Sequence, residues 1–159
     1  MLKRIYIDNY KCLVNFEVHL NRLNLFLGEN GSGKTSVFDA LRKIRAFVSG
    51  EGKVDHIFAF ADRCRWQTVF FQTFELDIQP PDNSGEFRYR LVIEHIEDGE
   101  KVRVKEEHLS FQGKPLFGFE MGEAQLYRDD HTAGPGYPYD WALSGLAAIS
   151  PRSDNKRLT

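Results

Sequence analysis

Residues 23–35 decide the fold, and they read Leu23-Asn24-Leu25-Phe26-Leu27-Gly28-Glu29-Asn30-Gly31-Ser32-Gly33-Lys34-Thr35. The first five form a short apolar run that stops at a glycine, which favours a buried central strand. The next eight match the pattern G-x-x-x-x-G-K-[ST] in full. The pattern is followed by residues with helical periodicity, so it lies between a predicted strand and a predicted helix, which is the context of a phosphate-binding loop.

The residue types of this loop suit the binding of a triphosphate. Glycines let the backbone wrap so that consecutive N–H groups point into one concavity, and the dipole of the following helix adds positive potential there. Lys34 can place its ammonium against the β- and γ-phosphates, while the Thr35 hydroxyl is a suitable oxygen ligand for Mg²⁺. We therefore predict a nucleoside triphosphate with magnesium at Gly28 to Thr35, and ATP as that nucleotide. The motif itself does not read the base.

Around this loop the periodicity predicts a hairpin before it and a helix after it. Ile5, Ile7 and residues 12–20 alternate apolar with polar positions, and residues 8–11 connect the two runs. From Lys34 the apolar residues fall on one helical face, and Ser49-Gly50 closes the helix. Residues 51–65 are mixed, with a short helix possible at 55–60.

Beyond Trp66 the pattern becomes that of an antiparallel meander. Strand-like runs cover 68–78, 87–96 and 101–111, with further short strands possible at 115–121 and 124–127. Residues 132–138 read as a loop, 141–149 as a helix of two turns and 151–159 as a polar tail. We expect one α/β domain with α+β character, divided into a P-loop core (1–65), an antiparallel β-subdomain (66–130) and a C-terminal part (131–159).

Composition places the chain among soluble globular proteins. It has 159 residues, of which 42% are hydrophobic, enough for one domain with a core. A formal charge of −2 gives no global basic field for nucleic acid. Cys12 and Cys64 have neither metal-like nor redox-like spacing, so we expect small buried or half-buried side chains. No run of about 18 apolar residues or signal peptide is present, and we predict no membrane association and a cytoplasmic location.

The first 50 residues resemble the N-terminal lobe of ABC-type ATPases, in the group of RecF, structural-maintenance-of-chromosomes and overcoming-lysogenization-defect proteins. The resemblance rests on residues 5–13, on the run 23–27, and on Gly28 to Leu41. It implies a P-loop NTPase fold with a mixed core sheet, one P-loop helix and an antiparallel β-subdomain. Beyond residue 50 the likeness is one of architecture only.

The resemblance also implies roles for individual residues. It assigns phosphate contacts to a set around the loop: Gly28, Asn30, Gly31, Ser32, Gly33, Lys34, Thr35 and Ser36. Lys34 is then the catalytic group and Thr35 the Mg²⁺ ligand, with Lys11 at the edge of the nucleotide. A glutamine is expected to touch Mg²⁺, and Gln125 is the candidate, in competition with Gln67, Gln72 and Gln112.

Two further parts of that family's active site have no clear counterpart in this sequence. Hydrolysis there needs an acidic pair after an apolar strand, and the nearest run ends in the single carboxylate Glu94, which is better read as solvated. Leu143-Ser144-Gly145-Leu146 starts like the family's signature segment, but Leu146 stands where a second glycine must approach phosphate. A packed helix explains it better, and we expect a lobe truncated from a longer ATPase.

Two weaker patterns can be explained by ordinary surface structure. Asp129-Asp130-His131 offers metal-ligand types, but adjacent residues on a Gly- and Pro-rich loop favour a solvated turn. Arg63, Arg65 and Trp66 combine cations with an aromatic ring, as single-strand binders do, yet a charged surface beside a buried Trp66 explains them as well.

Three functions follow from these observations. The first is an ATP-driven switch that dimerises around nucleotide in the full-length protein, hydrolyses it, and acts on DNA or with a nuclease. The second is a nucleotide-sensing or assembly module without hydrolysis. A small-molecule kinase is the third, but it would need a helix-rich chain with lid arginines, and the predicted β-meander disfavours it.

Overall fold

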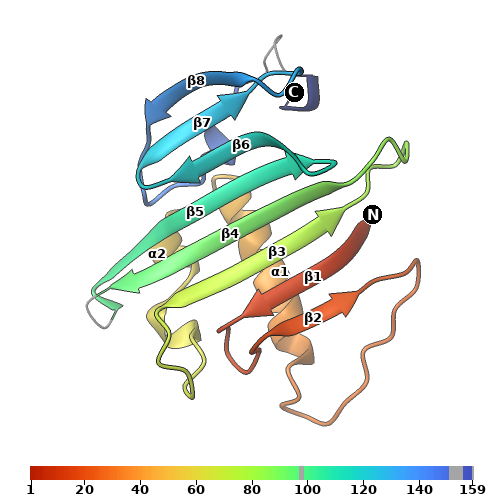
Figure 1. Cartoon of the computed structure of the whole chain (residues 1–159). Coiled ribbons are helices and arrows are strands. Elements are labelled where there is room, and N and C mark those ends of the chain that lie inside the picture. Colours follow the sequence, from red (N-terminus) through yellow and green to blue (C-terminus); the bar gives the residue numbers. More distant parts are fainter. Residues whose placement is uncertain (97–98, 151–155, 159) are drawn as a thin grey trace.

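The computed structural model describes residues 1–96, 99–150 and 156–158, which form one sheet with helices on one of its faces (Figure 1). The strands of this part of the chain are β1 (Leu2–Asp8), β2 (Phe16–His19), β3 (Phe71–Ile78), β4 (Phe87–Ile96), β5 (Lys101–Phe111), β6 (Lys114–Glu120), β7 (Glu123–Tyr127) and β8 (Ala133–Pro138). Their order in space is β2-β1-β3-β4-β5-β6-β7-β8, and each strand is antiparallel to its neighbours. The N-terminal hairpin and the meander therefore share one continuous sheet.

Helical segments cover the face of the sheet that is turned away from the viewer in Figure 1. They are α1 (Lys34–Val48), α2 (Val54–Ile57) and the short 3₁₀ turns η1 (Phe60–Asp62) and η3 (Leu146–Ala148). A further 3₁₀ turn, η4 (Lys156–Leu158), lies near the C-terminus (Figure 1). The buried face of α1 carries Val37, Ala40, Ile44 and Phe47, at the helical spacing seen in the sequence. This packing fixes the direction of α1 and so the place where its N-terminus meets the hairpin.

Aromatic rings dominate the core between the helices and the sheet. The rings of Tyr10 and Phe58 both pack against Phe74 in β3, with centroids 5.6 and 5.3 Å away. Phe47 of α1 meets Phe58 edge to face at 6.1 Å. All four rings are fully buried, and such aromatic pairs stabilise a core beyond the effect of buried area alone.

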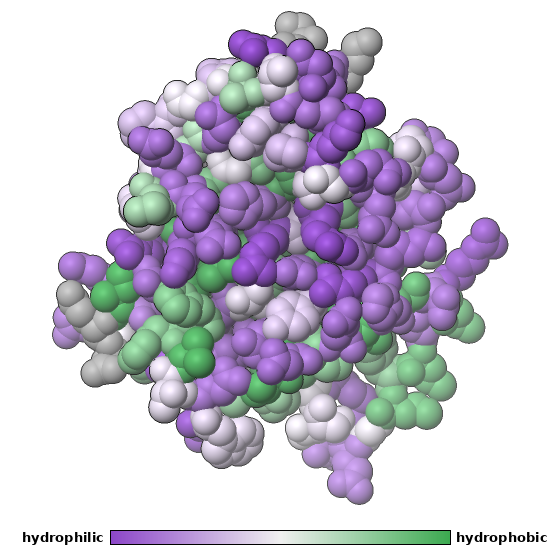
Figure 2. All heavy atoms as spheres, in the orientation of Figure 1, coloured by the Kyte–Doolittle hydropathy of each residue, from purple (hydrophilic) through white to green (hydrophobic). Residues whose placement is uncertain are grey.

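The opposite face of the sheet is open and charged, and Figure 2 shows it as largely hydrophilic. Oppositely charged side chains meet across strands: Glu75 of β3 lies 2.9 Å from Arg4 of β1 and 2.5 Å from Arg90 of β4. Arg88 reaches Asp77 at 2.6 Å. The alternation along each strand thus separates an apolar face from a solvated one.

Glu107 of β5 joins the C-terminal segment to the sheet by a buried polar cluster. Its carboxylate accepts hydrogen bonds from the Tyr89 hydroxyl (3.0 Å), the Ser144 hydroxyl (2.7 Å) and the Gly145 N–H (2.7 Å). Burial raises the pKa of this carboxyl, although these donors act in the opposite direction. Leu143 to Leu146 therefore belongs to a structural anchor, with a 3₁₀ turn in place of the predicted two-turn helix.

Several predicted elements are confirmed. The hairpin, the helix over 34–48, and the strands over 87–96 and 101–111 are present, and the short strands near 115–121 and 124–127 form β6 and β7. The prediction of a loop at 132–138 is wrong, because these residues form β8. Its prolines are compatible with an edge strand, since an edge needs hydrogen bonds on one side only. The predicted polar tail lies outside the described residues, apart from 156–158.

The predicted central strand at 23–27 is absent, and with it the predicted mixed sheet. Leu23, Leu25 and Leu27 are 90%, 80% and 80% exposed, and residues 23–27 adopt no regular structure. Figure 2 shows apolar side chains gathered at this loop between β2 and α1. A buried strand needs a neighbour on each edge, and no described strand pairs with this run. The sheet is therefore antiparallel throughout its described part.

Candidate phosphate-binding site

The loop before α1 has the backbone shape of an anion-binding concavity. Gly31 and Gly33 take left-handed conformations, with φ of 88° and 95°, and the Ser32 N–H donates to the Glu29 carbonyl at 3.2 Å. Gly33 is the residue before the helix and provides no side-chain cap. Since the first turn of α1 also holds no acidic residue, its free N–H groups and its dipole favour an anion.

The Lys34 ammonium is folded over this loop. Its Nζ donates to the carbonyls of Gly28 (2.5 Å) and Glu29 (2.8 Å) and to the Ser32 hydroxyl (3.2 Å). These contacts hold the positive charge against the loop, where a bound phosphate could accept hydrogen bonds from it. The donor set therefore fits a polyphosphate, which would take over the hydrogen bonds that the two carbonyls now accept.

Close packing at Gly33 ties the loop to the hairpin. A Cβ at this residue would lie 3.0 Å from the Cys12 sulfur and 3.1 Å from Leu13 Cδ2, so only glycine fits without a shift. The Cys12 Sγ also lies 3.7 Å from the Ser36 hydroxyl in the first turn of α1. Cys64 is buried as predicted, but the prediction for Cys12 is wrong, because its thiol is exposed beside the loop.

Thr35 and Ser36 stand in the first turn of α1, directly after Lys34. Thr35 is exposed, so its hydroxyl is accessible to a metal ion beside a bound phosphate. A Thr hydroxyl is a hard oxygen ligand of the kind that Mg²⁺ accepts, together with phosphate oxygens and water. Asn30, Gly31 and Ser32 are exposed on the same loop. The structure thus places the whole predicted set from Gly28 to Ser36 at one helix N-terminus.

Lys11 lies next to this site but is held by another partner. Its Nζ is 2.5 Å from Asp39 Oδ2 in α1, and Asp39 also accepts a 2.6 Å hydrogen bond from the Tyr10 hydroxyl. Partial burial alone would raise the pKa of Asp39, but the bonds from Lys11, Tyr10 and Arg42 outweigh it and hold that pKa far below its usual range. Lys11 therefore fastens the hairpin to α1.

Gln125 is not brought to the loop. It lies in β7, where its Nε2 donates to the carbonyls of Leu126 (2.8 Å) and Gly134 (2.9 Å). Four strands separate β7 from β1, which corresponds to roughly 24 Å at the usual strand spacing. We do not retain it as a metal ligand.

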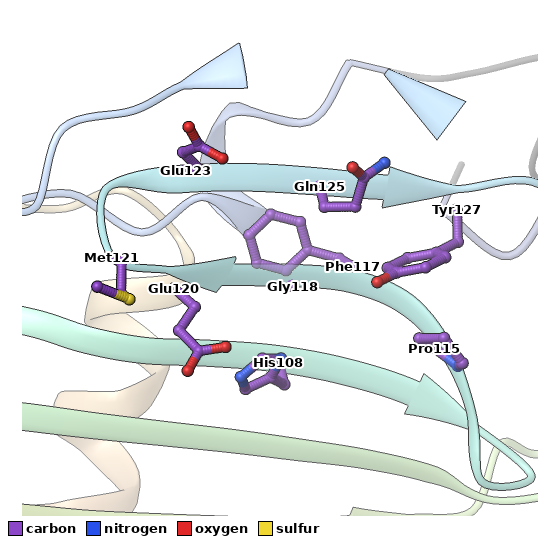
Figure 3. Close-up of a pocket in the computed structure, with 9 residues that line it drawn as sticks. All are labelled: His108, Pro115, Phe117, Gly118, Glu120, Met121, Glu123, Gln125 and Tyr127. Carbon is purple, nitrogen blue, oxygen red and sulfur yellow. The ribbon is translucent and has the colours of Figure 1, made fainter. Parts of the chain in front are cut away.

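Gln125 instead lines a pocket of about 630 Å³ on the open face of the sheet (Figure 3). This pocket lies above Gly118 of β6, between His108 of β5 and Tyr127 of β7. Apart from Gln125 it contains none of the predicted site residues.

The other patterns read from the sequence have structural partners. Glu94 of β4 pairs with Arg103 Nε at 2.6 Å, so its carboxylate is engaged on the open face of the sheet. Asp130 accepts hydrogen bonds from the backbone and the hydroxyl of Thr132, as a turn residue does. The prediction of a buried Trp66 is wrong, because its side chain is 85% exposed. Its position beside Lys11 and Cys12 depends on packing between distant segments, which no local pattern reveals.

Comparison with known proteins gives one family. Residues 1–112 match the family described as AAA ATPase domain, which covers the hairpin, the phosphate-binding loop, α1 and the strands up to β5. No curated protein matches the chain. Among the described residues, no helix combines the length and the apolar character needed to cross a bilayer. The family match and the geometry of the loop agree, and the chain belongs to the AAA ATPase domain family.

Proposed function

We propose that the chain is the nucleotide-binding lobe of an ABC-type ATPase of the RecF, SMC and OLD-like group. In this role the loop amides and Lys34 bind the phosphates of ATP, and Thr35 holds Mg²⁺. Two copies of the full-length protein close around two nucleotides, and hydrolysis reopens them to act on DNA or with a nuclease. Beside the family match, the observation that supports nucleotide binding most directly is the uncapped N-terminus of α1, with the Lys34 ammonium held against the preceding loop.

The residues of this chain contribute binding, orientation and charge. The amides from Gly31 to Ser36 would hold the β- and γ-phosphates in place before any bond breaks. Lys34 would stabilise the negative charge that develops on the transferred group, which is why we assign it a catalytic role. Bound Mg²⁺ supplies Lewis-acid stabilisation to the phosphate oxygens.

A nucleotide-sensing module without hydrolysis is the second candidate. It is supported by the carboxylates of Asp39 and Glu94, since each is already held by cationic side chains and is poorly suited to polarise a water molecule. Release of phosphate from Mg-ATP distinguishes the candidates. Turnover that the Lys34→Ala substitution abolishes supports the first, and binding without turnover in the full-length protein supports the second.

Isothermal titration calorimetry with Mg-ATP tests the binding site that both candidates share. Lys34→Ala removes a charge-assisted hydrogen bond to phosphate, worth about 1.5–3 kcal/mol, so we expect the affinity to fall about 10- to 150-fold. Lys114→Ala is the matched control, because Lys114 is an exposed lysine at the start of β6. Equal affinity of the Lys34→Ala variant and the wild type would refute the proposed function.

A further inference from the structure

A second pocket lies beside the phosphate-binding loop, on the other side of the hairpin turn. Its volume is about 280 Å³, and its lining residues are Lys11, Cys12, Ala61, Arg63, Arg65 and Trp66. Cys12 forms the boundary, because it lines this pocket while its sulfur lies 3.7 Å from the Ser36 hydroxyl and would be 3.0 Å from a Cβ placed at Gly33. One side chain therefore separates the pocket from the N-terminus of α1.

Two walls of this pocket are fixed by the fold. Lys11 is held by its ion pair with Asp39, and its backbone N–H donates to the Asp62 carbonyl at 2.6 Å. The guanidinium of Arg63 lies 4.1 Å from the ring centroid of Phe60 and donates to the Val69 carbonyl at 3.1 Å. The pocket is thus formed before any ligand arrives.

The remaining wall is formed by Trp66 and Arg65, and both side chains can stack on a flat ring. Trp66 is 85% exposed, and Arg65 has no hydrogen bond or ion pair with the described part of the chain. An indole face and a guanidinium plane both stack on nucleobases, and each stacked base contributes about 1–3 kcal/mol. A base bound here and phosphates bound at the N-terminus of α1 would lie on opposite sides of Cys12, with the ribose joining them.

We propose that the base of the bound nucleotide occupies this pocket, stacked on Trp66, and that the pocket does not select adenine over guanine. This inference rests on the proposed function, because it places the base from phosphates bound at the loop. It also assigns Arg63, Arg65 and Trp66 to nucleotide recognition. The sequence pattern alone is compatible with a nucleic-acid site or with an ordinary charged surface.

The absence of adenine selection follows from the hydrogen-bonding groups of the lining side chains. The nitrogen groups of Lys11, Arg63, Arg65 and Trp66 are all donors, and the Cys12 thiol is weak in either role. Guanine presents two acceptors, O6 and N7, to which an arginine donates in pairs. Adenine likewise presents acceptors in its ring nitrogens, and the amino group of either base, at N6 of adenine or N2 of guanine, needs an acceptor that these side chains do not offer. ATP and GTP are therefore bound with similar affinity.

Calorimetric titrations of the whole chain with Mg-ATP, Mg-GTP and Mg-tripolyphosphate test the proposal. For the wild type we expect the dissociation constants of ATP and GTP to agree within about tenfold. Trp66→Ala is expected to weaken both nucleotides about 5- to 150-fold and to leave tripolyphosphate unchanged. Trp66→Phe should keep most of the affinity, and Val14→Ala, at an exposed apolar residue of the hairpin that does not line the pocket, should keep all of it.

Tryptophan fluorescence gives an independent readout. Stacking on a base should change the emission of the wild type during titration with nucleotide but not with tripolyphosphate. The change should disappear in Trp66→Phe even though that variant still binds.

The outcomes separate the inference from the proposed function. The inference is wrong if ATP binds more than tenfold tighter than GTP, or if Trp66→Ala leaves both nucleotides unaffected. It is equally wrong if that variant loses affinity for a single-stranded oligonucleotide and keeps both nucleotides. If tripolyphosphate binds the wild type and Lys34→Ala weakens it, the proposed function survives each of these results. If tripolyphosphate and nucleotides fail to bind the wild type, the proposed function itself has failed.

Discussion

Gly33 is the residue at which backbone conformation and side-chain packing constrain the phosphate-binding loop together. Its φ of 95° is left-handed, and a Cβ there would approach Cys12 and Leu13 at 3.0 and 3.1 Å. We expect Gly33→Ala to lower the free energy of unfolding by about 2–4 kcal/mol, from left-handed strain and overpacking together. Urea denaturation measures this loss, and weaker binding of Mg-tripolyphosphate should accompany it.

Gly31 provides the matched control for the Gly33→Ala substitution. Its φ of 88° is also left-handed, but a Cβ there would meet no atom within 4 Å. Gly31→Ala should therefore cost only the backbone strain, about 1–2 kcal/mol. Equal losses for the two variants would show that the loop does not pack on the hairpin as described.

Individual residues also show how far the sequence predicts the site. Gly28 to Ser36 are consecutive, so their shared location at the N-terminus of α1 follows from the local pattern alone. Gln125 and Trp66 lie where they do because of sheet order and loop packing, which the chain determines only over long sequence separations. The sequence therefore predicts that the loop residues lie together at the helix N-terminus, but it predicts neither the distance of Gln125 from them nor the pocket beside Lys11.

Among the secondary-structure elements, the exposed run 23–27 differs most from the sequence prediction, which is a buried central strand. We predict that replacing Leu23, Leu25 and Leu27 together by serine changes the free energy of unfolding by less than about 0.5 kcal/mol per site, because these side chains are mostly in water. The same variant should associate less at high concentration, since an apolar run with low charge promotes aggregation. Denaturation and light scattering give the two measurements.

Leu91 is the control for that prediction because its side chain in β4 is fully buried. Leu91→Ala should cost about 2–5 kcal/mol. A comparable loss in the triple serine variant would mean that the run 23–27 packs as a strand, against the present account. The periodicity of α1, β4 and β5 predicted their limits well, whereas an apolar run alone could not reveal whether a neighbouring strand exists to bury it.

The free energy of unfolding of the whole molecule depends on pH because His95 is buried. Its Nε2 lies 2.8 Å from Gln72 Oε1, and burial, with a contribution from Arg63, lowers its pKa from 6.5 to about 4, while Asp62 acts in the opposite direction. Between these values the unfolded chain binds a proton that the folded chain does not. The stabilisation is therefore complete above pH 6.5 and is lost as pH falls toward 4, by about 3 kcal/mol in total.

Denaturation curves between pH 4 and pH 7 check this prediction. His95→Gln removes the titrating group, so its stability should be lower at pH 7 but should change less over this range than that of the wild type. The same pH slope in both proteins would assign the effect to other groups. No local pattern predicts this buried histidine, because it depends on the layer of helices and loops that covers β4.

In the proposed function, main-chain amides at the N-terminus of α1 bind phosphate, and amide chemical shifts in ¹H–¹⁵N NMR spectra report on those amides directly. On addition of Mg-tripolyphosphate to the ¹⁵N-labelled chain, we predict that the largest shifts occur at Gly31 to Ser36, and that Lys34→Ala weakens this response. The proposal would be wrong if the chemical shifts of these loop amides did not change at saturating ligand. It would also be wrong if the largest changes occurred around the pocket above Gly118 instead.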